Sequence, residues 1–411
     1  MQKKQQPSNP PARNQFIFLT FTHTILDSYA TLFPHILPFI LDRFASAANR
    51  NSFAGVLISL YSIFSSLGQI LFGWLSDRFR SVYFIAFGVA FTAIGLSLVG
   101  IAPSVWIVFI LLALGGLGVA AFHPQATTYA GALAAETRGM GIAIFLTGGN
   151  IGRALGPLLL LLLPYFYDDL NYLAWEMQVG ILVAILVPIV LDFDDELDLT
   201  ASARVLSDEE KTGRQSFWRV AVPHLLPLIV LFIIASLRTV TIAGLENFLS
   251  IYLKDDLNFS NWNRSLVIGV FIFAGSMGIM GSGWLLSKIN TLVLLLLSLV
   301  LAPPLLLASL HTDGIIFLVL LFLGNMVLTS SVTINIILAQ MMLRGHESIA
   351  ASFMMGASWG VGGLLNLIVG ELGDKYGLPI VLDGLVMVPL LIAPLILILR
   401  KQPDLSKTEA D

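Results

Sequence analysis

Charged residues are scarce and cysteine is absent in this chain of 411 residues. Only 12% of the residues are charged and 56% are hydrophobic, whereas a soluble domain carries about 25% charged residues. This composition excludes an ordinary soluble domain and indicates a membrane protein. Without cysteine, the chain has no disulfides, thiolate chemistry or Cys-type metal sites.

Two motif classes are also missing. The chain contains no Gly-x-x-x-x-Gly-Lys-[Ser/Thr] loop, so ATP bound at such a loop is not its energy source. Its six histidines show no His-x-x-His or His-Glu-x-x-His spacing. A membrane-embedded enzyme that uses His23 or His123 as a base is therefore a weak alternative, and we expect no enzyme, no metal and no cofactor.

Long apolar runs dominate what is present. Runs of about 20 residues, enough to cross a hydrocarbon layer of about 30 Å, recur along the chain. They lie at about 16–41, 52–75, 82–102, 105–133, 139–164, 172–191, 220–253, 262–287, 291–310, 315–342, 348–371 and 378–399. The sequence thus predicts an all-α membrane protein with twelve transmembrane helices. The start of the run 172–191 is the most polar and is expected in the membrane interface.

The two halves of the chain repeat one another. Residues 73–78 read Gly-Trp-Leu-Ser-Asp-Arg, and residues 283–288 read Gly-Trp-Leu-Leu-Ser-Lys. The glycine-rich segment 148–152 is similarly matched by 356–360. Such a repeat predicts two pseudo-symmetric bundles of six helices. The expected units are a tail at 1–15, a bundle at 16–191, a linker at 192–217, a bundle at 218–400 and a tail at 401–411.

Lysine and arginine positions predict the orientation. With the N terminus inside, fifteen of the 22 Lys and Arg residues fall in cytoplasmic segments, five in outer loops and two within spans. Both termini are therefore expected in the cytoplasm, and the protein in the inner or plasma membrane. The first apolar run is too long for a cleaved signal sequence. The acidic linker contributes much of the net charge of −4 and gives no sign of a nucleic-acid partner.

Three ionisable residues lie deep in predicted spans: Asp27, Arg153 and Arg238. Such groups cost about 2.5–3.5 kcal/mol each to insert and normally face a cavity or one another. Asp27 and Arg238 occupy corresponding positions of the two halves, so we expect them to face each other across a central cavity. The alternative is a buried charge pair without a transport role. His23 lies one turn from Asp27 on the same helix face.

The loop at Gly73-x-Leu75-Ser76-Asp77-Arg78 resembles the signature loop of the major facilitator superfamily. Segments in the first, fourth and fifth spans are similar to the fosmidomycin-resistance branch of that superfamily: residues 23–29, Phe122-His123-Pro124, residues 148–152 and Leu155-Gly156-Pro157. The resemblance implies the major facilitator fold and proton-driven export of small molecules. Leu112 stands where the superfamily's fourth-span motif has arginine, and Arg153 where the branch is expected to have a small residue.

Candidate functional residues fall into three groups. The proton-coupling candidates are Asp27, His23 and His123. The substrate-binding candidates are Arg153, Arg238, Asn150, Tyr29, Glu246 and Asn335. The gating candidates are Gly73, Asp77, Arg78, Arg80, Gly152, Gly156 and Pro157. A carboxylate at Asp77 facing a helix N terminus would contribute about 0.3–1 kcal/mol to closure, whereas the glycine row also suits simple helix packing.

These features predict a secondary active transporter that works by alternating access. Its partners would be protons, the lipid bilayer and a small anionic or polar organic molecule, and we expect a monomer. Proton-coupled efflux is the leading hypothesis. It rests on the resemblance, because an anion bound at the arginines would raise the proton affinity of Asp27 and so favour symport. A proton-coupled importer of an organic anion and a transport-dead sensor with the same fold remain the alternatives.

Overall fold

The structure is a computed structural model that describes residues 10–79, 81–134, 138–191, 217–286, 288–343, 346, 349–350 and 353–399. Every regular element in these ranges is helical. Within them, twelve helical segments are long and apolar enough to cross a membrane, from Ala12–Phe44 to Leu378–Leu399. The predicted number of spans is therefore confirmed. Most of the predicted linker and both tails lie outside the described residues.

The first six spans are built from helices α1 to α9. Their bounds are α1 Pro10–Ala30, α2 Phe33–Phe44, α3 Arg50–Ser62, α4 Gly68–Phe79, α5 Val82–Ser97, α6 Val105–Leu133, α7 Arg138–Leu160, α8 Leu162–Tyr167 and α9 Leu173–Val190. Three of these six spans are each made of two helices. The first divides into α1 and α2, with Pro34 in the first turn of α2, and the fifth divides into α7 and α8. The second divides into α3 and α4 around a π-helical turn.

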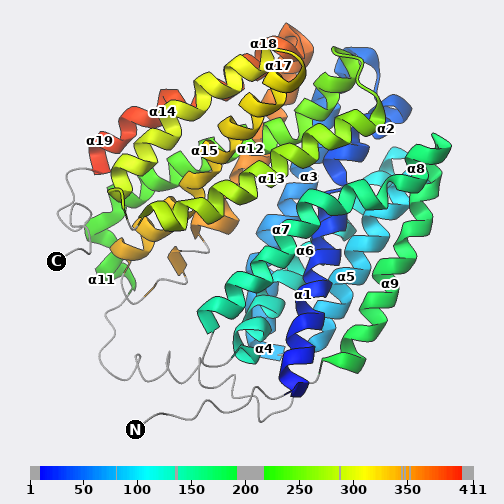
Figure 1. Cartoon of the computed structure of the whole chain (residues 1–411), viewed down its shortest axis with the longest axis horizontal. Coiled ribbons are helices and arrows are strands. Elements are labelled where there is room, and N and C mark those ends of the chain that lie inside the picture. The colour runs from blue at the N-terminus through cyan, green and yellow to red at the C-terminus, as the bar shows by residue number, and fades with distance from the viewer. Residues whose placement is uncertain are drawn as a thin grey trace.

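The last six spans run from α11 to α19. Their bounds are α11 Phe217–Ala221, α12 Leu225–Asp255, α13 Asn261–Leu286, α14 Thr291–Leu310, α15 Gly314–Met342, α17 Ser358–Tyr376, α18 Leu378–Ile392 and α19 Ile396–Leu399. Figure 1 shows these helices gathered on one side of the molecule and α1, α5, α6, α7 and α9 on the other. The two groups are the two bundles that the sequence repeat predicts.

Contacts between the bundles follow two seams. Along one seam α3 packs on α17, and along the other α7 packs on α13, while α2 contacts α12. Glycine lets α3 and α17 approach closely: a Cβ at Gly363 would collide with the Ser62 side chain, and one at Gly370 with the Asn51 carbonyl. Each of the two spans also contains a π-helical turn, at Ile63–Leu67 and Phe353–Ala357, and these turns touch.

Candidate functional site

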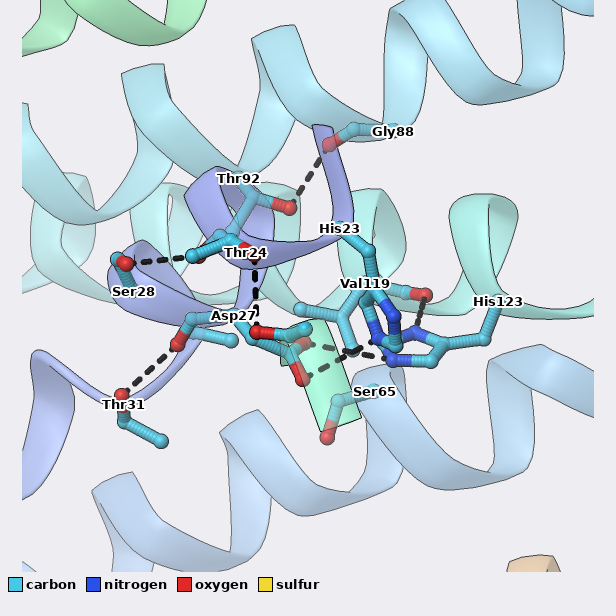
Figure 2. Close-up of polar contacts among 12 residues, drawn as sticks. His23, Thr24, Asp27, Ser28, Thr31, Ser65, Gly88, Thr92, Val119 and His123 are labelled. Atoms are coloured by element: carbon cyan, nitrogen blue, oxygen red, sulfur yellow. Dashed lines mark hydrogen bonds and ion pairs between the residues drawn. The ribbon is translucent and has the colours of Figure 1, made fainter. Parts of the chain in front are cut away.

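Two histidines converge on one carboxylate inside the first bundle (Figure 2). His23 Nε2 lies 3.3 Å from one oxygen of Asp27, and His123 Nε2 lies 3.4 Å from the other. His23 and Asp27 come from α1 at the i, i+4 spacing that the sequence predicted to share one helix face, and His123 comes from α6. The three proton-coupling candidates therefore form one cluster.

The other ring nitrogens determine where protons must be. Nδ1 of His23 lies 2.9 Å from the carbonyl of Phe145, and Nδ1 of His123 lies 2.9 Å from that of Val119. A carbonyl only accepts, so both Nδ1 atoms must donate, and the Nε2 atom of a neutral ring is then an acceptor facing Asp27. Each Nε2–carboxylate contact is a hydrogen bond only when a proton lies between the two groups. The geometry therefore favours a cluster that holds extra protons.

Aromatic rings shield the His23 end of this cluster from water. His23 is 2% exposed and stacks on Phe145 with a centroid distance of 4.2 Å, and Phe122 lies 5.5 Å away. The His123 side chain is 26% exposed and is the most accessible member of the cluster. A proton that enters or leaves the cluster therefore has its most open path at His123.

Glycines of α7 make room for α1. A Cβ at Gly149 would lie 2.5 Å from Nε2 of His23 and 2.7 Å from a carboxylate oxygen of Asp27. Side-chain atoms at Gly152 and Gly156 would collide with Thr24 and Ser28 of α1. The glycine row therefore serves the packing of α7 against α1 within the first bundle, which is the alternative to gating that the sequence offered. It does not by itself make Gly152 or Gly156 a gating residue; Pro157 is likewise buried within α7.

A second polar group lies where the bundles meet. Arg153 of α7 approaches Glu246 of α12, with 3.8 Å between a guanidinium nitrogen and a carboxylate oxygen. Both residues line a pocket between the bundles. The other lining residues are Asn150, Ile242, Phe271, Ile272, Gly275, Ser276, Ile279, Asn325, Thr329, Val332 and Trp359. Three of the substrate-binding candidates, Asn150, Arg153 and Glu246, are therefore brought together.

The histidine cluster and this pocket are neighbours. Arg153 is close enough to interact electrostatically with His123, and Tyr61 of α3 with Asp27, Arg153 and Glu246. The hydroxyl of Tyr61 donates to the Ala30 carbonyl at 3.0 Å, where the first span bends. A change of charge in the cluster therefore changes the electrostatic potential at the seam between the bundles.

The expected meeting of Asp27 and Arg238 is wrong. Asp27 is occupied by the two histidines, whereas Arg238 donates weakly to Ser331 at 3.4 Å and Thr239 at 3.3 Å. Arg238 is 1% exposed, and its Nε has no hydrogen-bond partner among the described residues. Residues at equivalent positions of a repeat occupy equivalent places in their own bundles, and this equivalence does not put them in contact.

Two further substrate-binding candidates also lie away from the pocket lining. The buried Tyr29 hydroxyl donates to the Glu176 carbonyl and accepts from the Gly180 amide at 3.1 Å, so it joins α1 to α9. Asn335 is 1% exposed and does not line the pocket; Asn325 of the same helix does, and it donates to the Phe271 carbonyl at 2.6 Å. Trp359 and Phe271 line the pocket but were not among the predicted substrate-binding residues, because an aromatic residue in an apolar span carries no distinctive sequence signal.

The gating candidates of the loop that follows the second span, Gly73, Asp77, Arg78 and Arg80, are only partly described by the structure. The side chain of Asp77 and the whole of Arg80 lie outside the described residues. Arg78 is exposed, with its guanidinium carbon 5.9 Å from the ring centroid of Trp74, and a Cβ at Gly73 would meet no atom within 4 Å. The gating role of these residues stays a prediction.

A polar latch instead joins the bundles at the opposite ends of the helices, which we call the Arg50 end. Asp374 of α17 accepts from the backbone amides of Asn51 and Ser52, both at 2.8 Å, at the first turn of α3. Arg50 pairs with Asp255 at 2.6 Å, and Lys254 pairs with Asp42. Nearby, Arg264 of α13 is buried and donates to the His35 carbonyl at 3.4 Å, although the sequence placed it in an outer loop.

The histidine cluster also has the composition of a metal site. One ligand atom from each of His23, Asp27 and His123 lies within 4.8 Å of the others. Two imidazoles and a carboxylate are a donor set that divalent transition metals accept. The spacing of these residues in the chain predicted no metal, but their donor atoms could hold one. Experiments on the cluster should therefore include a chelator.

Two bundles of six membrane helices, with a pocket between them that contains Arg153 and Glu246, are the architecture of a transporter that moves small molecules between two facing halves. The sequence profile of the Major Facilitator Superfamily matches residues 17–366. The chain belongs to this superfamily and is a multi-pass membrane protein.

Individual relatives agree with this assignment. The chain is 26% identical over 397 residues to the fosmidomycin resistance protein of Escherichia coli (strain K12), a match that covers 93% of each protein. It is 24% identical over 375 residues to the uncharacterized MFS-type transporter YfnC of Bacillus subtilis (strain 168), covering 91% of this chain and 90% of that protein.

Solved structures show the same fold. A bacterial homologue of the human lysosomal transporter Spinster, in an inward-facing and occupied conformation, matches with a TM-score of 0.79 at 14% identity, covering 98% of this chain and 100% of that one. A mutant of the peptide transporter POT matches with a TM-score of 0.68 at 16% identity, covering 95% of each chain.

Proposed function

We propose that this protein is a secondary active transporter that exports a small anionic or polar organic molecule in exchange for protons. It works by alternating access: the two bundles rock about the Arg153–Glu246 pocket and expose it to one side of the membrane at a time. The protein acts as a monomer in the inner or plasma membrane with both termini in the cytoplasm. It is a transporter without enzymatic activity and needs no cofactor.

The histidine cluster carries the proposal. Both Nδ1 atoms donate to carbonyls, so the two contacts between the histidines and Asp27 need protons to become hydrogen bonds. A proton-driven transport cycle requires a site that binds protons from one side of the membrane and releases them to the other. Its protonation changes the charge beside Arg153, which lines the pocket at the seam.

The substrate and the direction rest on other observations. Arg153 and Asn150 offer hydrogen-bond donors to a carboxylate, phosphate or phosphonate, and Trp359 and Phe271 offer apolar contacts. The name of the Escherichia coli relative indicates resistance to fosmidomycin, which supports export of a molecule of that kind.

Flux in proteoliposomes tests this function. Protein reconstituted with fosmidomycin inside is given an inwardly directed proton gradient, with a chelator present. We expect the gradient to drive fosmidomycin out through the wild-type protein. Asp27→Asn should abolish this gradient-driven flux while leaving part of the exchange of fosmidomycin across the membrane that occurs without a gradient. Asp383→Asn is the matched control, because Asp383 pairs with His311 at 3.1 Å, away from the cluster.

Normal gradient-driven flux through Asp27→Asn would refute the coupling role. Direction is tested in cells: an exporter lowers fosmidomycin accumulation and raises resistance, whereas an importer does the reverse. A sensor that has lost transport shows no flux under any gradient.

A further inference from the structure

The three side chains of the histidine cluster meet as hydrogen-bond acceptors. His23 and His123 each donate Nδ1–H to a backbone carbonyl at 2.9 Å, so the Nε2 atom of each neutral ring is left with a lone pair. These two Nε2 atoms lie 3.3 and 3.4 Å from the oxygens of the Asp27 carboxylate, which also accepts. Figure 2 shows the two rings turned toward this carboxylate. Acceptors that converge in this way require a cation between them, and a metal ion meets that requirement as well as a proton does.

The spacing of the ligand atoms fits a metal ion with tetrahedral coordination. Zn²⁺ binds imidazole nitrogen at about 2.0–2.1 Å and carboxylate oxygen at about 2.0–2.2 Å, so two ligands of one tetrahedral ion lie about 3.3–3.5 Å apart. The Nε2–oxygen distances of 3.3 and 3.4 Å fall in this range. One ligand atom from each of the three residues also lies within 4.8 Å of the others. The ligand atoms therefore need to move little to contact a single ion.

The outer partners of metal ligands are also in place. A histidine that binds a metal usually donates its other ring N–H to a carbonyl or a carboxylate, which fixes the tautomer and the orientation of the ring. His23 makes this bond to Phe145 on α7, and His123 makes it to Val119 on α6. The ring of Phe145 also stacks on His23, with 4.2 Å between the centroids. Both Nε2 atoms are thus held beside the carboxylate before any ion binds.

Gly149 of α7 keeps the space beside two of the ligand atoms open. A Cβ at this position would lie 2.5 Å from Nε2 of His23 and 2.7 Å from an oxygen of Asp27, which is close to a metal–ligand distance. Gly149 is not part of the glycine row at 152 and 156 that packs α7 on α1, so that packing does not account for it. The His123 side chain is 26% exposed and gives an ion, with a water as its fourth ligand, a route to the site.

The donor set selects among metals. Two imidazoles and one carboxylate, with a position left for water, suit Zn²⁺ and other divalent transition metals. Mg²⁺ and Ca²⁺ take about six or more oxygen ligands, whereas the only carboxylate of the cluster is that of Asp27. In the part of the chain that the structure describes, no second group of three His, Asp or Glu side chains comes together within the same distance. We therefore expect a single ion per chain.

We propose that His23, Asp27 and His123 bind one divalent transition-metal ion, for which Zn²⁺ is the probe. The binding site itself does not depend on the proposed function, but its consequence rests on that function. A bound ion occupies the nitrogen and oxygen atoms that would hold the protons, so a filled site stops the proton-driven cycle. The metal is then an inhibitor of transport and not a cofactor.

Zn²⁺ binding to the purified protein tests the site directly. Zn²⁺ is titrated by calorimetry into chelator-treated protein that carries no polyhistidine tag. We expect one ion per chain and no binding of Mg²⁺. His23→Gln and His123→Gln should each weaken Zn²⁺ binding by at least about tenfold, since loss of a group that only orients a metal ligand already costs about 10–100-fold. His311→Gln is the matched control, because His311 pairs with Asp383 away from the cluster and should leave the affinity unchanged.

No Zn²⁺ binding by the wild-type protein overturns the proposal, as does equal affinity in the wild type, His23→Gln and His123→Gln. A second measurement needs no variant and decides the matter if the substituted proteins do not fold. X-ray absorption at the zinc edge of the loaded wild-type protein should show two imidazoles and oxygen ligands, with bonds of about 2.0–2.2 Å. A zinc ion with fewer than two imidazoles would show that it binds somewhere else.

Flux in proteoliposomes tests the consequence. Zn²⁺ is added at a concentration that fills the site but stays well below that of fosmidomycin, so that complexes with the substrate cannot remove it. Gradient-driven flux should stop, return with a chelator and be unaffected by Mg²⁺. Continued flux through protein with a filled site overturns the inhibitory role. The binding and absorption measurements involve no transport, so the metal site can fail while Asp27→Asn still abolishes driven flux, and the proposed function can fail while Zn²⁺ binds.

Discussion

Removal of the Asp374 carboxylate should open the Arg50 end of the molecule. Asp374 accepts two backbone N–H groups at 2.8 Å from the first turn of α3, in the opposite bundle. Loss of a capping acceptor at a helix N terminus costs about 1 kcal/mol. Loss of the negative charge at that terminus costs about 0.3–1 kcal/mol more.

Asp374→Ala should therefore destabilise the conformation closed at this end by about 2 kcal/mol, which is about a thirty-fold change in population. The neighbouring Arg50–Asp255 pair is partly exposed, and such pairs contribute at most about 1 kcal/mol. Asp374 is thus expected to contribute more free energy to closure at the Arg50 end than the Arg50–Asp255 pair does.

Spin-label distances measure the effect. The chain has no cysteine, so cysteines introduced at the exposed positions Ala48 and Asp313 are the only labelling sites. We expect Asp374→Ala to add a population with a longer distance between the labels. Asp383→Asn removes a carboxylate that pairs within the second bundle and should leave the distances unchanged. An unchanged distribution in Asp374→Ala would show that the cap does not hold this end closed.

Three further predictions concern the interior. Gly149→Ala should disrupt the histidine cluster and gradient-driven flux, whereas Gly283→Ala, where a Cβ meets no atom within 4 Å, should be neutral in the same assay. Tyr29→Phe should lower stability by about 1–3 kcal/mol in thermal unfolding, because the Gly180 amide loses its acceptor, and should leave substrate affinity intact. Arg238→Met should raise the melting temperature, since a guanidinium with an unpaired Nε is buried there; a lower value would indicate a compensating anion.

Much of the architecture was accessible from the sequence. The number of spans and their approximate limits follow from apolar length, because each helix must satisfy its own backbone within the bilayer. The duplicated segments predicted two bundles, and the i, i+4 spacing of His23 and Asp27 predicted their contact. The bends were less accessible: Pro34 signals the break after α1, but no residue pattern predicted the π-helical turns at Ile63–Leu67 and Phe353–Ala357.

Residue order along the chain was enough to show which segments cross the membrane and which residues of one helix share a face, because both depend on close neighbours in the chain. The polar groups that meet across helices could be identified only in the folded protein. Asp27 faces His123 and not Arg238, and Arg153 faces Glu246, because helix rotation, tilt and close glycine contacts set these distances. Those quantities arise from packing over the whole bundle, and no local spacing in the chain encodes them.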